Sequence, residues 1–259
     1  MIDSHCHLAD EAFAQDLSDV AVRARDAGLT ATLCILSADE PEEVDRASVV
    51  ASAWPATRFA AAVHPHRAGP YHGRVPDALA ATRAAVIATD ARAIGETGLD
   101  YHYDFAPRAV QQEVFAGQIA LAVELGRPIV VHTREAFDDT LAVIQEAGQH
   151  RVRGVMHCFS GTLAEARRAV DIGFFVSLAG ILTFPKAGEL RDVARALPLD
   201  HLLVETDAPF LAPVPYRGKR NEPAWVARTL VALAEARHEP VEEMDAAITE
   251  NFSRFLGLR

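Results

Sequence analysis

Short apolar runs alternate with longer amphipathic runs along the whole chain. The apolar runs predict β-strands centred near Ile2, Leu33, Ala61, Ile94, Val130, Val155, Phe175 and Val204. The amphipathic runs predict helices over residues 17–27, 42–53, 77–86, 108–125, 136–147, 163–172, 189–197 and 225–236. A further helix, over residues 241–256, closes the chain. Alternation of this kind is typical of an α/β protein whose strands are parallel.

Eight strand–helix repeats predict a (β/α)8 TIM barrel with an additional C-terminal helix. A doubly wound open sheet shares the alternation and is the competing interpretation. The strand count favours the barrel, as does the lack of a glycine-rich GxGxxG turn after the first strand. The sequence contains no linker-like stretch, so a single domain over residues 1–259 is expected.

Five of the predicted strands end on a histidine or a carboxylate. The residues concerned are His5, His7, Glu96, His132, His157 and Asp207. Each could serve a structural role if taken alone, as a buried hydrogen-bonded histidine or as a helix cap. Active sites of TIM barrels lie at the carboxyl ends of the strands, so all six side chains would face one shared site.

The first of these strand ends, DSHCHL, carries the strongest chemical signal. His5 and His7 are two residues apart, so in an extended chain both imidazoles point to the same face. Two neutral imidazoles on one face supply half of a typical metal site. Cys6 points to the opposite face, where it would pack as a small apolar side chain.

Composition narrows the possible partners and the compartment. The net charge of −11 argues against a broadly basic surface for nucleic acid, although metal ions could still hold such a substrate locally. Three cysteines cannot form a complete disulfide framework, which fits a reducing compartment. A strand-like run begins at residue 2 and no apolar stretch reaches membrane-spanning length, so a cytoplasmic protein without a membrane partner is expected.

Several segments resemble one known family. They are MIDSHCHL, VHPH, IGETGLDYHYDFAPRAVQQEVFAGQIALA, PIVVHTREA, HCFSG, LLVETDAPFLAP and RGKRNEP. In this order and over nearly the whole chain they resemble the TatD-type metal-dependent deoxyribonucleases, which belong to the amidohydrolase superfamily.

The resemblance implies two divalent metal ions. It implies that His5, His7 and Asp207 hold one ion, that His132 and His157 hold the other, and that Glu96 bridges both. The chain has no lysine before Lys186, so a carboxylated lysine is not available as the bridge. A ligand set of imidazoles and carboxylates suits Zn, Mn, Co or Ni better than Mg alone, and the identity of the ions stays open.

Other residues are candidates for supporting roles. Asp207 could orient a water molecule and accept its proton, with Glu96 as the other catalytic carboxylate. Glu205, on the same face and one layer deeper, could fix a histidine N–H group or Asp207. The candidate substrate contacts are His64, Ser160, Arg217 and Arg220. Arg217 and Arg220 belong to a short basic cluster, and such a cluster can equally be an ordinary solvated surface.

An aromatic cluster follows the fourth strand. Tyr101, Tyr103 and Phe105 could stack on nucleobases, or they could pack against the next helix. The sequence does not decide between these two roles.

The favoured function is divalent-metal-dependent hydrolysis of phosphodiester bonds in DNA, as a 3′–5′ exonuclease acting on single strands or 3′ ends. The alternative is a metal-dependent carbonyl hydrolase, such as a D-aminoacyl-tRNA deacylase or another amidohydrolase. A third hypothesis is a barrel without turnover that binds metal or serves in quality control, and the complete ligand set argues against it. No obligate protein partner is evident.

Overall fold

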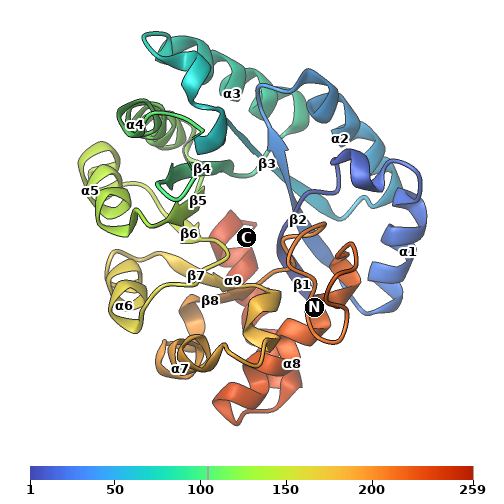
Figure 1. The fold of residues 1–259 in the computed structure, drawn as a ribbon. Helices are drawn as coiled ribbons and strands as arrows, with labels where there is room; N and C mark the ends of the chain where they lie inside the picture. Colours follow the sequence, from blue (N-terminus) through green and yellow to red (C-terminus); the bar gives the residue numbers. More distant parts are fainter. Residues whose placement is uncertain (104, 259) are drawn as a thin grey trace. The chain divides into compact units, whose positions relative to one another are not determined.

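The computed structural model describes residues 1–103 and 105–258, and its elements are labelled in Figure 1. The strands are β1 (Ile2–Cys6), β2 (Ala31–Ser37), β3 (Thr57–Ala62), β4 (Ile94–Asp100), β5 (Ile129–Arg134), β6 (Gly154–Met156), β7 (Phe175–Leu178) and β8 (Leu202–Val204). The helices are α1 (Leu17–Asp26), α2 (Pro41–Ala53), α3 (Val75–Thr89), α4 (Arg108–Leu125), α5 (Phe137–Gly148), α6 (Leu163–Asp171), α7 (Gly188–Ala196), α8 (Val226–Arg237) and α9 (Val241–Leu256).

Every predicted strand and helix is present, including the helix that closes the chain. The largest difference in length is in α3, which begins at Val75 and ends at Thr89, whereas the amphipathic pattern predicted residues 77–86. A proline at the second position of α3 is compatible with a helix start, because the first turn does not use that N–H group.

The chain forms two compact units. Unit 1 comprises Met1–Cys34, Val49–Arg58 and the chain from Cys158 onward, and unit 2 comprises Ile35–Ser48 and Phe59–His157. The predicted single domain stays a prediction, and each unit is described by itself.

Unit 1 contains two pairs of parallel strands. In the first pair, β1 lies beside β2, with Ile2 opposite Ala31. In the second, β7 lies beside β8, with Val176 opposite Leu202. The loop after β8 then continues along β1, where Ala208 bridges to Cys6. This contact brings a segment late in the sequence to the carboxyl end of the first strand.

Unit 2 holds a run of parallel strands from β3 to β6. Ala60 of β3 bridges to Ala93, just before β4. Strand β4 pairs with β5, and Ile129 of β5 lies opposite Gly154 of β6. Parallel strands joined through helices are the predicted α/β arrangement.

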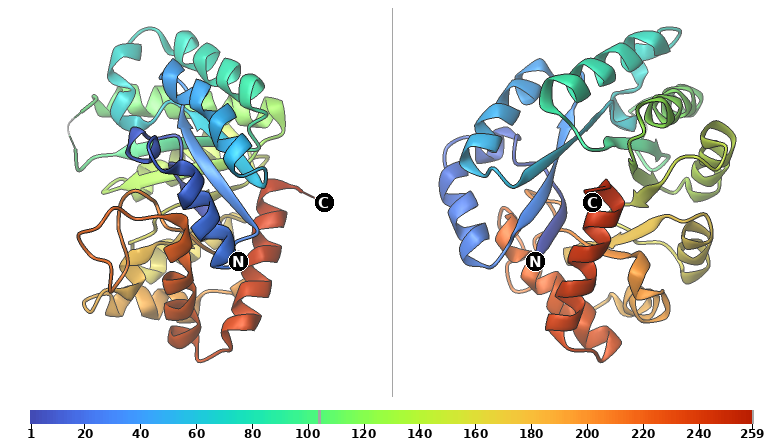
Figure 2. Two further views of the ribbon diagram at one scale, coloured as in Figure 1. Left: turned by 90° about the vertical axis from the view of Figure 1, so that its right-hand side faces the viewer. Right: turned by 180° about the vertical axis from the view of Figure 1, so that it is seen from behind.

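The helices of each unit bury one apolar side. In unit 1, α9 lies beside α8, as Figure 2 shows, and buries Phe252 and Phe255. In unit 2, α4 lies between α3 and α5 and buries Phe115 and Ile119. No helix among residues 1–103 and 105–258 is both long enough and apolar enough to cross a membrane.

A glycine allows β4 to approach β5 closely. Gly98 has φ of +134°, and a Cβ atom built there would lie 2.0 Å from the carbonyl oxygen of His132. Any side chain at this position would therefore collide with the backbone of β5. The contact lies beside His132, one of the residues that the sequence singled out.

Candidate functional site

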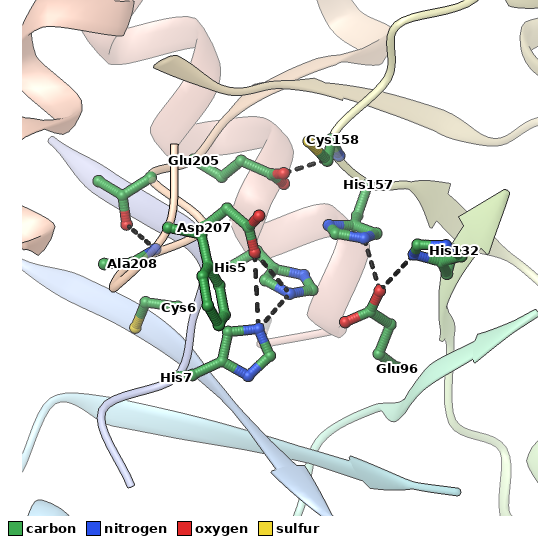
Figure 3. Close-up of polar contacts among 12 residues, drawn as sticks. His5, Cys6, His7, Glu96, His132, His157, Cys158, Glu205, Asp207 and Ala208 are labelled. Atoms are coloured by element: carbon green, nitrogen blue, oxygen red, sulfur yellow. Dashed lines mark hydrogen bonds and ion pairs between the residues drawn. The ribbon is translucent and has the colours of Figure 1, made fainter. Parts of the chain in front are cut away.

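His5, His7 and Asp207 lie together in unit 1, and we refer to them as the unit 1 cluster (Figure 3). The Nε2 atoms of His5 and His7 are 3.3 Å apart. The Oδ1 atom of Asp207 lies 3.7 Å from Nε2 of His5 and 3.5 Å from Nε2 of His7. The His5 side chain is fully buried, whereas those of His7 and Asp207 are partly exposed.

Backbone hydrogen bonds explain how residues so distant in sequence meet. The N–H group of Asp207 donates to the carbonyl of His5 at 2.9 Å, and the N–H group of His7 donates to the carbonyl of Ala208 at 2.7 Å. Asp207 itself has φ of +57°, a left-handed conformation that aspartate tolerates better than most residues. The turn at Asp207 therefore aims its carboxylate at the end of β1.

A buried carboxylate supports this arrangement from below. Asp3 accepts hydrogen bonds from the N–H groups of His5 and Thr206 and from the Thr206 hydroxyl. Burial raises the pKa of Asp3 to about 8, although the hydrogen bonds from Thr206 and His5 act in the opposite direction. Asp3 therefore ties β1 to the segment that precedes Asp207, a role that the sequence pattern did not reveal.

The spacing of the unit 1 cluster fits a metal ion. For zinc held tetrahedrally by ligands at about 2.0–2.1 Å, neighbouring ligand atoms lie about 3.3–3.4 Å apart. The three atoms of the unit 1 cluster are 3.3, 3.5 and 3.7 Å apart. Two imidazoles and one carboxylate are also the usual donors for zinc and its neighbours among the divalent ions.

Glu96, His132 and His157 lie together in unit 2, and we refer to them as the unit 2 cluster (Figure 3). The Oε1 atom of Glu96 lies 2.7 Å from Nε2 of His157 and 2.8 Å from Nδ1 of His132. Burial acts to raise the pKa of Glu96, but His157, His64 and His132 outweigh it and hold the pKa well below its ordinary value. Glu96 is therefore an ionised carboxylate at neutral pH.

A second carboxylate determines which nitrogen of His132 faces Glu96. The fully buried Asp100 places Oδ2 2.9 Å from Nε2 of His132 and 2.8 Å from Nε2 of His66. The Nε2–H group of His132 is thus donated to Asp100, and Nδ1 is directed at Glu96. Burial acts to raise the pKa of Asp100, but hydrogen bonds, above all from His132, lower it below its ordinary value.

Sequence reasoning assigned no role to His66 or Asp100, although a signal existed. Glu96 and Asp100 lie four residues apart on β4, so a strand of period two puts both on one face. His64 and His66 repeat the two-residue spacing of His5 and His7.

His64 is arranged as a hydrogen-bond donor. Its Nδ1 atom accepts the N–H group of His66 at 3.2 Å, so the proton belongs to Nε2, which lies 3.2 Å from Oε1 of Glu96. Burial lowers the pKa of His64 to about 4, against the opposing effect of Glu96. The side chain is therefore a neutral imidazole at neutral pH, with its N–H group directed at the unit 2 cluster.

Two further predicted residues have definite positions in unit 1. Glu205 is fully buried, and its Oε1 atom accepts the N–H group of Cys158 at 2.7 Å. It therefore holds the backbone next to His157. Ser160 is exposed ahead of α6, where Thr162 and Glu165 form a capping box.

The two predicted basic contacts differ in how they are held. Arg220 makes a two-pronged ion pair with Asp16, with both N–O distances at 2.7 Å, and also donates to the carbonyl of Ala12. The guanidinium group of Arg217 instead lies over the ring of Phe184, 3.9 Å from the ring centre. Arg220 thus has a structural partner within the chain, and its contact with substrate stays a prediction.

Comparison with known proteins covers nearly the whole chain. The sequence profile described as TatD related DNase matches residues 2–257. A metal-dependent hydrolase of Escherichia coli named YcfH is 40% identical over 263 residues, covering 100% of this chain and 96% of that protein. The 3′-5′ ssDNA/RNA exonuclease TatD of Klebsiella pneumoniae is 32% identical over 265 residues, covering 100% of this chain and 98% of that protein.

Comparison with a solved structure shows which fold the chain has. The crystal structure of YJJV, a TatD homolog from Escherichia coli, matches with a TM-score of 0.88 at 30% identity, covering 98% of this chain and 97% of that one. The predicted fold class, an α/β protein of the TIM-barrel type, is confirmed.

The fold, the imidazole–carboxylate clusters at the strand ends and the relatives define a metal-dependent hydrolase. More narrowly, the chain belongs to the TatD related DNase family, as its motifs predicted.

Proposed function

We propose that the protein is a deoxyribonuclease that removes nucleotides from the 3′ ends of single-stranded DNA. The observation that carries the proposal is the pair of clusters at the strand ends, each made of two imidazoles and one carboxylate. The Klebsiella relative, whose name specifies a 3′-5′ exonuclease of single-stranded DNA and RNA, supports the choice of substrate and direction.

Each cluster would hold one divalent ion. His5, His7 and Asp207 would hold one, and His132, His157 and Glu96 the other. The role expected of Glu96 as a bridge between the two ions stays a prediction. The cytoplasmic location stays a prediction as well. When bound, such ions would withdraw charge from the phosphate and lower the pKa of water, which would make the phosphorus more electrophilic and the water a better nucleophile.

The protein groups would supply orientation and proton transfer. Asp207, the more exposed carboxylate of the two clusters, would orient the attacking water and accept its proton. His64, neutral and with its proton on Nε2, would donate a hydrogen bond to a phosphate oxygen or to the leaving group. Glu205 would act indirectly, by holding the backbone at Cys158 and so the neighbouring His157.

Ser160 and Arg217 would contact the phosphates of the strand. Ser160 is exposed just before α6, where the capping box already uses the N–H groups of Thr162 and Glu165. The hydroxyl group of Ser160 is therefore a better candidate than the end of the helix. Arg217 would contribute charge from the loop after β8.

The test is to remove metal with a chelator, dialyse, and add back Mn²⁺, Co²⁺, Zn²⁺ or Mg²⁺ one at a time. Single-stranded DNA labelled at the 5′ end should be shortened stepwise only after metal is restored, and Asp207→Asn should abolish the reaction. Inert DNA combined with rapid turnover of D-aminoacyl-tRNA or simple esters would instead identify the carbonyl hydrolase. Full metal content without turnover of any substrate would favour a binding protein.

A further inference from the structure

Large exposed aromatic side chains are rare in this protein, and they gather beside histidines. Within the part of the chain that the structure describes, three such rings are exposed: Tyr103 at 40%, Phe105 at 64% and Phe210 at 55%. Tyr103 and Phe105 both meet the ring of His66 edge-on, with centres 5.4 and 4.9 Å away. In unit 1, Phe210 meets His7 in the same manner at 6.0 Å. Water-exposed rings that recur at a candidate site indicate a ligand with flat apolar faces.

Tyr103 and Phe105 form one surface, which we call the aromatic shelf. Their rings are nearly parallel, with an angle of 14° between the planes and 5.3 Å between the centres. The shelf lies close to the unit 2 cluster, because His66 touches both rings and shares the carboxylate of Asp100 with His132.

Tyr101, the third aromatic residue of this segment, has a different role. Its hydroxyl group donates to Asp139 of α5 at 2.7 Å, and the guanidinium group of Arg108 of α4 lies over its ring at 4.2 Å. Of the two roles that the sequence left open, packing against a helix and stacking on a nucleobase, Tyr101 therefore has the first. Tyr101 packs against the neighbouring helices, whereas the aromatic shelf faces solvent.

The chain on either side of the aromatic shelf is firmly held. The N–H group of Tyr103 donates to Oδ1 of Asp100 at 2.9 Å. On the other side, Ala106 is buried, and its carbonyl accepts the side-chain amide of Gln111 at 2.9 Å. The same amide also bonds to the carbonyl of Asp100 at 3.0 Å. Rings that adjoin residues held in this way lose little conformational entropy when a ligand binds.

A positive charge lies at the Tyr103 end of the shelf. The guanidinium group of Arg134, the last residue of β5, lies over the ring of Tyr103, 4.8 Å from its centre, so the outer face of Phe105 is the one left for a further ring. A flat apolar surface next to a guanidinium group matches a nucleotide, which carries a flat base and a negatively charged phosphate.

We propose that the aromatic shelf binds an unpaired nucleobase by stacking, with Arg134 contacting the adjacent backbone phosphate, so that the protein selects single-stranded nucleic acid. A base inside a duplex has both faces covered by its neighbours, whereas an unpaired base can extend the stack that Tyr103 and Phe105 begin. The inference deepens the proposed nuclease function and rests on it.

The test measures binding separately from cleavage. A single strand that carries 2-aminopurine is titrated with metal-free protein in chelator, and stacking is read as quenching of its fluorescence. The variants are Phe105→Ala, which removes the flat face, and Phe105→Trp, which keeps one. Ile87→Ala is the matched control, because Ile87 is an apolar residue of α3 that is 71% exposed. A fully abasic strand with a fluorescein label, whose binding is followed by anisotropy, serves as the second ligand. KM and kcat for the base-bearing strand are then measured in the presence of metal.

Phe105→Ala should raise both Kd and KM for the base-bearing strand about tenfold, with the change in KM rather than kcat, whereas Phe105→Trp and Ile87→Ala should bind as the wild type does. Equal affinity of the wild type and Phe105→Ala for the base-bearing strand would overturn the inference. An equal loss for the abasic strand would also overturn it, because backbone contacts would then be responsible. Quenching by the metal-free protein, with no cleavage once metal is added, would support base stacking on the aromatic shelf and refute the proposed nuclease. Cleavage that is unchanged in Phe105→Ala would support the nuclease and refute base stacking on the shelf.

Discussion

The two clusters use the same kinds of side chain in different ways. In the unit 1 cluster the two imidazole nitrogens and the carboxylate oxygen are 3.3 to 3.7 Å apart, at or beyond the usual length of a hydrogen bond. In the unit 2 cluster one oxygen of Glu96 lies within 2.8 Å of two imidazole nitrogens. The first spacing fits an ion directly, whereas in the second the carboxylate and the imidazoles are in direct contact and must separate slightly to admit one.

The support beneath the two clusters differs as well. Asp3 acts on the backbone of unit 1, since it accepts N–H groups of His5 and Thr206. Asp100 acts on the imidazoles of unit 2, since its carboxylate lies within hydrogen-bond distance of the Nε2 atoms of both His66 and His132. A carboxylate of the first kind sets where a ligand lies, and one of the second kind sets which of its nitrogens is presented.

The largest effect is expected from Glu96→Gln. The substitution removes the negative charge that faces three imidazoles, so kcat/KM should fall by about a thousandfold or more. Metal analysis should show that the ion of the unit 2 cluster is lost, while Asp207→Asn, the counterpart in unit 1, should retain it. Full metal content in Glu96→Gln would show that the carboxylate is not a ligand.

A large loss of stability is expected from Gly98→Ala, which disturbs the backbone beneath the unit 2 cluster. The added Cβ would collide with the carbonyl of His132, so the free energy of unfolding should fall by about 3 kcal/mol. Urea denaturation of the metal-free protein measures this. Gly126→Ala is the control: Gly126 also has positive φ, but nothing lies within 4 Å of its added Cβ, so about 1 kcal/mol should be lost. Equal losses would show that β4 and β5 are not in close contact at Gly98.

A moderate effect is expected from Asp100→Asn. The amide has nearly the shape of the carboxylate but accepts hydrogen bonds less strongly, so the affinity of the unit 2 cluster for metal should fall about 10- to 100-fold. In unit 1, Asp3→Asn should leave metal affinity within about threefold, because Asp3 bonds to backbone and hydroxyl groups rather than to an imidazole. Competition with a chromogenic chelator measures both. If the two variants behave alike, the distinction between the two kinds of support is wrong.

The smallest effect is expected at the basic loop of unit 1. Arg217→Ala should raise KM for single-stranded DNA about threefold and reduce the dependence of KM on salt. Arg220→Ala should change KM less, because its guanidinium group is already paired with Asp16. Steady-state kinetics between 50 and about 200 mM salt compares the two variants. A greater effect of Arg220→Ala would show that the ion pair opens to receive the strand.

The sequence predicted the order of elements and the chemistry of the strand ends, because both follow from local rules. Period two puts His5 and His7 on one face, and a polar residue after a buried apolar run marks the end of a parallel strand. The start of the helix predicted over residues 163–172 is equally local, because its capping box, formed by Thr162 and Glu165, uses residues three apart.

The supporting residues depend on contacts distant in sequence, which local patterns do not specify. The guanidinium group of Arg220 pairs with Asp16, 204 residues earlier, a partner that the sequence pattern did not indicate, and its contact with substrate stays a prediction. Asp100 pairs with His132 of the neighbouring strand, next to the close approach of β4 to β5 at Gly98. Nothing in the alternation of apolar and polar residues indicates which neighbouring strand a side chain will meet.

The bond between the loop after β8 and the end of β1 has a consequence for how the protein is made. Asp3 and Thr206, which it joins, are 203 residues apart, so the first histidines leave the ribosome long before their carboxylate is synthesised. A metal ion at the unit 1 cluster would then close a very large loop of the chain. The ion would bind late in folding and would be released whenever the segment after β8 separates from β1.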